Sequence, residues 1–319
     1  MLAIAASSYG PLARLKALEM PRPQPGPAEV QVKVIASALN PADYKVLLGK
    51  MKFLHARNFP MVVGYDFSGT VEAVGSEVRE FAAGDAVFGF LPYGPGNRRG
   101  AFAEMLVANR KELALKPAGV SHEVAAASAT PGLTALTALR DLGRLKGSGR
   151  VLVTGVSGGV GALGVGIARR WQAEVTAVGS PAGLEQARRM GATTLIDRNR
   201  QDVFAEAKGP FDVIFDAAAA YRWSQWSGHL KPGGAYVTTL PTLGFGIDKV
   251  RSLFSSSRAE LVMVKSRSAD LELLAEWLST GLEVPLDSTL PVREVAAGLE
   301  RLESGRQLGR IAIRVAGGF

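Results

Sequence analysis

The sequence predicts an α/β protein that combines a doubly wound parallel sheet with a smaller β-rich unit. After residue 150, apolar strand-like runs alternate with helical patterns, which is typical of a parallel sheet covered on both faces. The first third instead has short strands between glycine and proline turns, which is typical of a compact, barrel-like β unit. Because residues 290–315 resemble the first third, we expect the end of the chain to return to the β-rich unit.

The elements of the β-rich unit follow from alternation and from turn residues. A proline-rich loop over 21–27 precedes a predicted strand over 30–36, in which valine and lysine alternate. Further strand-like runs over 67–74 and 85–90 are bounded by glycines that mark turns. Ser121 is the expected N-cap of an alanine-rich helix, with which the character of the sequence changes.

The elements of the parallel sheet alternate in the order that strand–helix–strand units require. Strands are predicted over 150–155, 174–179, 193–197, 211–217, 235–239 and 261–265. Helices are predicted over 159–171, 181–190 and 270–280, and the tail adds one helix and a last strand over 310–315. Residues 151–168 are uncharged and nearly long enough to span a membrane, but their six glycines divide them into a strand, a turn and a helix. We therefore expect a cytoplasmic protein without a membrane partner, since the N-terminus also lacks the basic region of a signal peptide.

The composition excludes several classes of chemistry. The chain of 319 residues has no cysteine, which excludes disulfides, thiolate zinc sites, cysteine nucleophiles and iron–sulfur clusters. A metal site built from histidine alone would need all three histidines, so we predict no metal site. The net charge is +8, but the lysines and arginines are scattered as singles and doublets without interleaved aromatics. This pattern favours a solvated surface, and a nucleic-acid partner is not expected.

The most informative motif is a glycine loop after the first strand of the parallel sheet. Gly155, Gly158 and Gly161 follow a predicted strand and open a predicted helix, the context in which such a spacing is informative. Gly155 permits the tight turn, and Gly161 lets helix and strand pack closely. Gly158 and Gly159 let a pyrophosphate approach the backbone, where the helix N-terminus presents N–H groups. The motif predicts a dinucleotide cofactor.

The end of the second strand indicates which dinucleotide binds. Loops that bind NAD usually place an acidic residue there, whereas this strand ends at Gly179 and Ser180, and no acid occurs before Glu185. A carboxylate would repel a 2′-phosphate, while a serine hydroxyl donates to it. The sequence therefore favours NADPH, and we expect NADPH to bind at least about tenfold tighter than NADH.

Several segments together carry a family resemblance. They are ALNPADYKVLLGK (38–50), FPMVVGYDFSGTVEAVGSEVREFAAGDAVFGF (59–90), GAFAEMLVANRKELALKP (100–117), GLTALTAL (132–139), TGVSGGVG (154–161) and the closing GRIAI (309–313). In this order they resemble the zinc-independent quinone oxidoreductase branch of the medium-chain dehydrogenase/reductase superfamily. The NPADYK and GYD segments are similar to the subgroup that reduces alkenals and other activated alkenes.

The resemblance implies an architecture and a reaction. It implies a GroES-like catalytic domain over residues 1–121 and 284–319, and a Rossmann domain over residues 122–283 that binds NADP(H). It implies hydride transfer from NADPH to a quinone or to an α,β-unsaturated carbonyl (an enone), usually by a homodimer. Zinc alcohol dehydrogenases of this superfamily use cysteine and histidine ligands, so a chain without cysteine is expected to act without zinc on an acceptor that is already electrophilic.

The resemblance also implies residues near the reacting groups. Asn40 and Lys45 match positions near the nicotinamide ribose, and a solvated surface lysine is the alternative for Lys45. Tyr44 and Tyr65 are candidate donors to the acceptor oxygen, with aromatic packing as the alternative for each. Thr134 matches a position beside the nicotinamide, and a helix-interior threonine is its alternative. The catalytic candidates are Asn40, Tyr44, Lys45 and Tyr65, whereas Asp43 and Asp66 are expected to order loops by accepting backbone N–H bonds, with acid–base chemistry as the alternative.

Residues around the parallel sheet complete the predicted cofactor site. Thr239 and Leu240 end a late strand, and ligands bind at the carboxyl ends of parallel strands. The basic residue that the family often has after the Ser180 position is missing, so we expect Arg198, just after the third strand, to hold the 2′-phosphate. The predicted cofactor-binding residues are Asn40, Lys45, Thr134, Gly155, Ser157, Gly158, Gly159, Val160, Gly179, Ser180, Arg198, Thr239 and Leu240.

Two other hypotheses stay open at this point. Many quinone reductases of the family have a tyrosine near the position of Met51, and its absence weakens the quinone assignment. In the first of these hypotheses, the chain is a catalytically weak relative that is kept as an NADPH-binding regulatory protein. In the second, it is a relative that interacts with nucleic acid through its basic surface. Oxidation of NADPH by quinones or short enals separates these hypotheses from the reductase.

Overall fold

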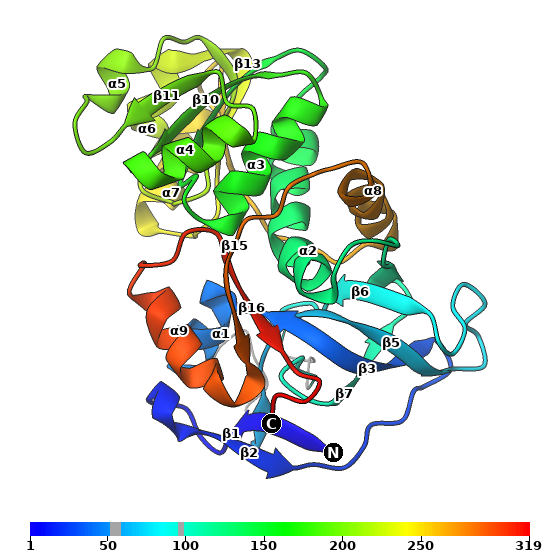
Figure 1. Cartoon of the computed structure of the whole chain (residues 1–319). Helices are drawn as coiled ribbons and strands as arrows, with labels where there is room; N and C mark the ends of the chain where they lie inside the picture. The colour runs from blue at the N-terminus through cyan, green and yellow to red at the C-terminus, as the bar shows by residue number, and fades with distance from the viewer. Residues whose placement is uncertain (52–58, 95–98) are drawn as a thin grey trace. The chain divides into compact units, whose positions relative to one another are not determined.

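The computed structural model describes residues 1–51, 59–94 and 99–319 and divides into two units. The first unit comprises Met1–Thr130, Lys265–Gly281 and Leu286–Phe319, and the second comprises Pro131–Val264 and Leu282–Pro285. One unit is β-rich and the other has a parallel sheet with helices, as the sequence predicts (Figure 1). The domain boundaries at 121/122 and 283/284 stay a prediction.

A seven-stranded sheet forms the centre of the first unit. Its strands are β3 (Glu29–Ala38), β5 (Asp66–Val74), β6 (Ala86–Phe90), β7 (Met105–Asn109), β8 (Leu113–Leu115), β15 (Leu286–Pro291) and β16 (Arg310–Arg314). The order is β15-β16-β3-β5-β6-β8, and β7 also pairs with β3. Strand β16 is antiparallel to β3, with Ala312 opposite Ala38. The expected return of the chain end to the β-rich unit is therefore confirmed.

The first unit also contains a smaller sheet and short helices. The sheet has the order β2-β1-β4, formed by β1 (Leu2–Ala6), β2 (Leu15–Glu19) and β4 (Met61–Val62). The helices are α1 (Pro41–Leu47), α8 (Ser268–Ser279), α9 (Val295–Glu303) and the first part of α2 (His122–Leu136). Helix α1 begins after Asn40, with Pro41 at the first position, where a missing N–H costs nothing. This start places Asn40 and Asp43 beside the buried strands.

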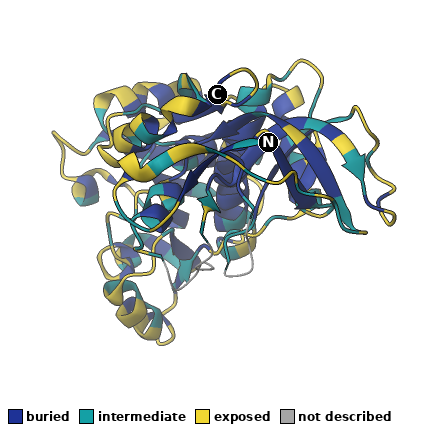
Figure 2. Ribbon diagram, turned by 90° about the horizontal axis from the view of Figure 1, so that it is seen from below, coloured by how far each residue is buried: buried dark blue, intermediate teal, exposed yellow. Residues whose placement is uncertain are grey.

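The second unit contains a six-stranded parallel sheet in the order β11-β10-β9-β12-β13-β14. The strands are β9 (Arg150–Thr154), β10 (Glu174–Gly179), β11 (Thr194–Asp197), β12 (Phe211–Asp216), β13 (Leu230–Thr238) and β14 (Arg258–Leu261). The helices are α3 (Gly159–Arg170), α4 (Pro181–Arg189), α5 (Val203–Glu206), α6 (Trp223–Trp226) and α7 (Leu243–Ser252), with the end of α2. Numbered by chain position, this is the strand order 3-2-1-4-5-6 of a dinucleotide-binding fold. The strands are mostly buried and the exposed residues lie on helices and loops (Figure 2).

Two expectations from the sequence have different outcomes. The uncharged residues 151–168 form β9, the glycine turn and most of α3, as predicted, and no helix in the described ranges is long and apolar enough to cross a membrane. The strand predicted over 261–265 is wrong in position, because β14 is Arg258–Leu261. Its parallel register with β13, which pairs Ala235 with Arg258 and Thr238 with Leu261, fixes the strand earlier than the most apolar residues.

Candidate active site

The glycine loop of the second unit makes a turn that requires glycine at two positions. Gly155, directly after β9, has φ +67°, and a Cβ there would lie 2.9 Å from both the nitrogen and the Cβ of Ala218. A Cβ on Gly161 would lie 2.4 Å from the carbonyl oxygen of Gly155. The first turn of α3 therefore packs directly against the end of β9, as the sequence predicts.

Gly158 differs from these two glycines, because the space into which a Cβ would point is open. It is the N-cap of α3 and has an extended backbone, φ −96° and ψ 163°. A Cβ on Gly158 would have no neighbour closer than the carbonyl oxygen of Gly155, at 3.6 Å. The first N–H groups of a helix have no partner within the helix, so Gly159 and Val160 begin a helix end suited to a phosphate. The loop therefore fits the pyrophosphate of a dinucleotide.

Hydroxyl groups from two loops meet beside the glycine loop. The Oγ atoms of Ser157 and Ser180 lie 3.0 Å apart, and Ser180 is the N-cap of α4 after Gly179 ends β10. The backbone N–H of Arg198 donates to the carbonyl oxygen of Gly179 at 3.1 Å, and the Arg198 side chain is exposed. The structure thus brings four predicted cofactor residues together at the end of β10.

Gly183 belongs to this arrangement, although the sequence reasoning missed it. A Cβ on Gly183 would lie 2.1 Å from Ser157 Oγ and 2.9 Å from the Ser157 nitrogen. Only glycine lets the first turn of α4 approach the glycine loop so closely. The available signal was a glycine in the first turn of the helix after the second strand.

A buried carboxylate at the end of β12 is a second feature that the sequence reasoning missed. Asp216 accepts hydrogen bonds from Thr154 Oγ1 at 2.5 Å and from the Tyr236 hydroxyl at 2.7 Å. It also accepts from the backbone N–H of Tyr221 at 2.8 Å. Burial and the Asp216 charge raise the pKa of Tyr236 well above its ordinary value, so its hydroxyl stays a donor. Asp216 thereby ties β9, β12 and β13 together beside the glycine loop.

The two residues predicted at the end of β13 directly follow Thr238, which lies opposite Asp216 in the parallel register of β12 and β13. Thr239 Oγ1 donates to the carbonyl oxygen of Ala217 at 3.3 Å. Leu240 is 39% exposed and lines a small hollow with Tyr221 and Thr238, among other residues. The structure places both residues at the carboxyl end of the sheet, on the side where β9 leads into the glycine loop.

The first unit contains a buried polar network around Asp66, the first residue of β5. Arg310 Nη2 donates to Asp66 Oδ2 at 2.6 Å, and Asn40 Nδ2 donates to the same oxygen at 3.0 Å. Arg310 Nη1 donates to Asn40 Oδ1 at 3.0 Å. Asp66 Oδ1 accepts from the Thr130 backbone N–H at 2.9 Å and from the Thr130 hydroxyl. Burial raises the pKa of Asp66, and Arg310 opposes that shift by stabilising the charged form.

Asp43 adds a second buried carboxyl to this network. Its Oδ2 accepts from the backbone N–H of Asn40 at 2.6 Å, so both aspartates order backbone as expected. Its Oδ1 is buried and has no hydrogen-bond partner among the residues that the structure describes. Burial raises the pKa of Asp43 from 3.8 to about 8, with the Asn40 N–H opposing and the Asp66 charge adding to the increase. Asp43 is thus mainly protonated at neutral pH.

The candidate donors divide into a buried and a half-buried group. Tyr65 is 3% exposed, and its ring packs edge-on against Tyr93 with centroids 4.5 Å apart; burial and the nearby Asp43 raise its pKa well above 10. Tyr44 and Lys45 lie half-buried on α1. Burial raises the pKa of Tyr44 and, together with Lys50, lowers that of Lys45. Thr134 is 7% exposed within α2, in the second unit.

We expect Asp43→Asn to flatten the dependence of stability on pH. The folded pKa of about 8 lies above the unfolded value, so the folded protein binds this proton more tightly. The stabilising effect of the proton is complete below pH 4 and is lost as pH rises to about 8, by up to about 1.4 kcal/mol per pH unit. Urea unfolding between pH 5 and 7.5 should show this slope in the wild type and in Glu19→Gln, an exposed control. An equal slope in Asp43→Asn would contradict it.

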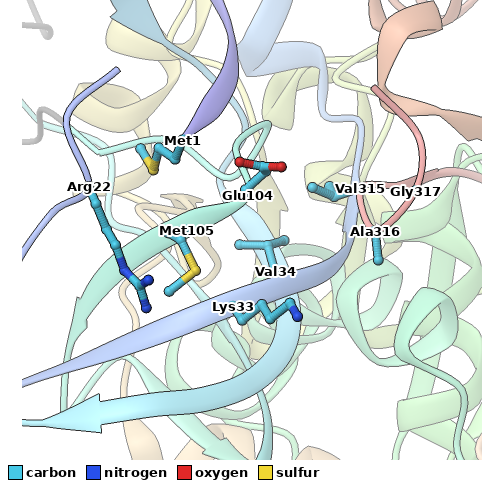
Figure 3. Close-up of a pocket in the computed structure, with 9 residues that line it drawn as sticks. All are labelled: Met1, Arg22, Lys33, Val34, Glu104, Met105, Val315, Ala316 and Gly317. Atoms are coloured by element: carbon cyan, nitrogen blue, oxygen red, sulfur yellow. The ribbon is translucent and has the colours of Figure 1, made fainter. Parts of the chain in front are cut away.

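The first unit also contains a larger hollow (Figure 3). It has a volume of about 430 Å³, and its described lining includes Arg22, Lys33 and Glu104 with apolar residues of β3 and the chain ends. Glu104 Oε2 already accepts from the backbone N–H of Leu2 at 2.7 Å. Because no predicted site residue is among its described lining residues, we do not assign the reaction to this hollow.

The side chains in the described ranges do not form a donor set that fits a zinc ion. The sequence has no cysteine, and in the described ranges no three histidine, aspartate or glutamate side chains are grouped to hold a metal. The buried carboxylates are instead held by Arg310, Asn40 and backbone N–H groups. No step through a metal is therefore derived for this chain.

Comparison with known proteins agrees with the fold. The chain matches the alcohol dehydrogenase GroES-like domain over residues 26–118 and the zinc-binding dehydrogenase family over residues 190–313. It is 30% identical to a chloroplast envelope quinone oxidoreductase homolog of Arabidopsis thaliana, over 98% of each chain. It is 31% identical to a trans-enoyl reductase of Aspergillus terreus, over 91% of this chain and 87% of that one. The solved quinone oxidoreductase of Coxiella burnetii matches with a TM-score of 0.87 and 28% identity, over 99% of both chains. The chain therefore belongs to the medium-chain dehydrogenase/reductase superfamily, and it is an oxidoreductase of the kind to which quinone oxidoreductase homologues and trans-enoyl reductases belong.

Proposed function

We propose that this oxidoreductase transfers hydride from NADPH to a quinone or an α,β-unsaturated carbonyl, without zinc. The main observation in support is at the end of β10, where the hydroxyls of Ser157 and Ser180 lie 3.0 Å apart. Next to Ser157 in the chain, Gly158 leaves open the space into which a Cβ would point. These groups suit a phosphorylated ribose next to a pyrophosphate. The names of the Arabidopsis and Aspergillus relatives support the two acceptor classes.

The charge distribution around β11 supports NADPH over NADH. Strand β11 ends at Asp197, which lies opposite Gly179 in the parallel register. The Asp197 carboxylate is engaged locally, because its Oδ1 accepts from the Asn199 N–H at 2.9 Å and its Oδ2 lies 3.8 Å from Arg200 Nε. Arg198 follows directly, is exposed, and is anchored by its backbone to Gly179. Arg198 is therefore the cation that we assign to the 2′-phosphate.

The acceptor must arrive already electrophilic. The nicotinamide supplies the hydride when it is bound, and the residues that the structure describes include no group of three metal-ligating side chains to polarise an alcohol or a simple ketone. A quinone or enone needs orientation and a hydrogen bond to its oxygen. We assign orientation of the ribose and acceptor to Asn40 and Lys45, and donation to the acceptor oxygen to Tyr44 or Tyr65. The raised pKa values of both tyrosines keep their hydroxyl groups protonated at neutral pH.

The cofactor assignment predicts a measurable preference. Fluorescence titration should give an NADPH dissociation constant at least about tenfold below that of NADH, because only NADPH carries the phosphate that Arg198 and Ser180 face. Arg198→Ala should remove most of this difference, while Arg200→Ala, whose side chain is 82% exposed, should keep it. Equal affinities for the two nucleotides in the wild type would contradict the proposal.

The acceptor assignment is tested by turnover. NADPH oxidation, followed by absorbance against a panel of quinones and short enals, should be fast with at least one class. Tight NADPH binding without turnover would favour a regulatory NADPH-binding protein instead. We further propose that the protein acts on its small-molecule substrate as a homodimer.

A further inference from the structure

A carboxyl group and three phenol groups from separate segments of the first unit lie close together. Asp43 is in the first turn of α1, Tyr65 comes directly before β5, and Tyr93 comes shortly after β6. The Tyr65 and Tyr93 rings pack edge-on, with centroids 4.5 Å apart. The Asp43 charge raises the pKa of both tyrosines, and Tyr9, after β1, adds to the increase at Tyr65. We call these four residues the Asp43 cluster.

Two polar atoms of the Asp43 cluster are buried and have no hydrogen-bond partner among the residues that the structure describes. They are Asp43 Oδ1 and the Tyr9 hydroxyl oxygen. Unpaired buried polar atoms destabilise a folded protein, so native structures have few of them and each one needs an explanation. The other Asp43 oxygen, Oδ2, accepts from the backbone N–H of Asn40 at 2.6 Å, which holds the carboxyl group in place. Because Asp43 is mainly protonated at neutral pH, Oδ1 can hold a proton that no described group accepts.

The charged and polar groups around Asp43 set its proton affinity near neutral pH. Burial and the Asp66 charge of β5 favour the protonated form, whereas Arg310 of β16 favours the ionised form. The backbone N–H groups of Asn40 and Gly64 also favour the ionised form. The result is a pKa of about 8, so Asp43 holds a proton at pH 7 and can release it at little cost. General acids are most effective when their pKa lies near the working pH.

Tyr65 is the candidate donor that belongs to this cluster. The pKa of Tyr44, the other candidate, is raised by burial and by Glu303, so its charged neighbour is on α9 instead. Tyr65 is 3% exposed, and burial and Asp43 raise its pKa well above 10. After one proton leaves the pair, the negative charge is thus favoured on Asp43 over Tyr65 by at least about 100-fold, or two pKa units. Tyr65 would therefore give up a proton readily only when Asp43 replaces it.

We propose that Asp43 stores the proton of the reaction and passes it through the Tyr65 hydroxyl to the acceptor oxygen. This role rests on the reductase function proposed above. When hydride reaches the β-carbon of an enone, the C=C π bond breaks and an electron pair moves to the carbonyl oxygen, which takes the Tyr65 proton. The Asp43 Oδ1 proton replaces it, and solvent returns a proton to Asp43. NADPH and one proton thus give NADP⁺ and the enol, which becomes the saturated carbonyl compound.

A purely structural role for Asp43 accounts for fewer of its contacts. Ordering the start of α1 explains the bond between Oδ2 and Asn40 but gives no reason for a buried Oδ1 without a described partner. Hydrogen bonds between proton-transfer groups are often long until substrate binds, so Oδ1 and the Tyr65 hydroxyl need not be in contact beforehand. Asp85 shows the purely structural arrangement, because its Oδ2 accepts from the Ala82 N–H at 2.8 Å and the residue is partly exposed. Asp85 is therefore the matched control for Asp43.

The first test is the pH dependence of turnover with the quinone or enone that the protein reduces. The proton of Asp43 is present below its pKa and lost above it, so the wild-type kcat should be level near pH 6–7 and fall above about pH 8. Asp43→Asn keeps an acceptor for the Asn40 N–H but has no acidic proton. It should lower kcat by about 100-fold and abolish this fall, with KM and the NADPH dissociation constant within about twofold of wild type. Asp85→Asn should change none of these quantities.

Two further measurements test the route through Tyr65. Tyr65→Phe should lower kcat about as much as Asp43→Asn, and the double variant should be no slower than Tyr65→Phe, because the two groups act in one path. Infrared spectra at pH 7, recorded without any cofactor, should show the C=O band of a protonated carboxyl group that Asp43→Asn lacks. Tyr65→Phe should shift this band, since the neighbouring hydroxyl is gone.

The outcomes separate a failure of the proton relay from a failure of the reductase function. If the wild type reduces an acceptor and Asp43→Asn keeps its kcat and pH profile, the proton comes from elsewhere and the reductase stands. A double variant about tenfold slower than Tyr65→Phe would show that Asp43 acts without Tyr65. If Asp43→Asn does not fold, an undiminished kcat in Tyr65→Phe overturns the relay by itself. No turnover of any quinone or enone by the wild type would remove the reductase function and the relay together.

Discussion

Replacing Arg310 with methionine is expected to lower the free energy of unfolding by about 3–5 kcal/mol. Arg310 is 5% exposed and donates to the fully buried Asp66 carboxylate at 2.6 Å. Methionine keeps much of the side-chain volume but leaves Asp66 without its counter-charge in a region that water does not reach. The oxygens of Asn40 and Ala127, which accept from Arg310 at 3.0 and 3.1 Å, lose a donor at the same time. An unpaired buried charge costs far more than the pair contributes.

The measurement is chemical denaturation followed by circular dichroism, with an exposed ion pair as the control. Arg22 contacts Glu72 at 2.7 Å, with side chains 48% and 43% exposed, so Arg22→Met should cost no more than about 1 kcal/mol. The double variant Asp66→Asn with Arg310→Met should recover part of the loss, because it removes the unpaired charge. If Arg310→Met costs no more than Arg22→Met, the buried pair does not stabilise the first unit as we infer.

This ion pair also shows where prediction from the sequence stops. Asp66 and Arg310 are separated by 244 residues. The sequence indicates that Asp66 orders backbone and that the chain end rejoins the β-rich unit, and both are seen. It does not indicate that Arg310 is the counter-charge, because that depends on the pairing of β16 with β3. Asp216 was missed for the same reason, since its donors come from three separate strands and loops.

The glycine loop was predictable because its constraints are local. Gly155 must adopt a positive φ, and Gly161 must approach the preceding strand, within one strand–turn–helix unit. Strand β14 was misplaced because its position depends on a neighbour. Residues 261–265 are more strand-like by composition, but the register with β13 selects Arg258–Leu261. Periodicity locates an element, and tertiary pairing decides which residues form the ladder.

Gly158→Ala is expected to abolish tight NADPH binding while leaving the protein folded. The backbone of Gly158 is extended, with φ −96° and ψ 163°, so alanine adopts it without strain. The nearest atom to a Cβ there is the carbonyl oxygen of Gly155 at 3.6 Å, an ordinary contact. Under the proposed cofactor assignment, this Cβ would occupy space that the pyrophosphate needs. We expect the NADPH dissociation constant to rise by about 100-fold, or about 2.7 kcal/mol, with a melting temperature within about 2 °C of wild type.

Variants at two other glycines show whether Gly158 is needed for cofactor binding or for folding. A Cβ on Gly161 would lie 2.4 Å from the Gly155 oxygen and 2.8 Å from the Thr154 oxygen, so Gly161→Ala must displace α3 and should lower stability by about 1–3 kcal/mol as well as binding. Gly228 has no atom within 4 Å of a Cβ, and Gly228→Ala should change neither. Titration and thermal melting of the three variants therefore separate a glycine that makes room for a ligand from one that makes room for the fold. If Gly158→Ala binds NADPH like the wild type, no phosphate lies over this loop, and the cofactor assignment falls while the Rossmann fold stands.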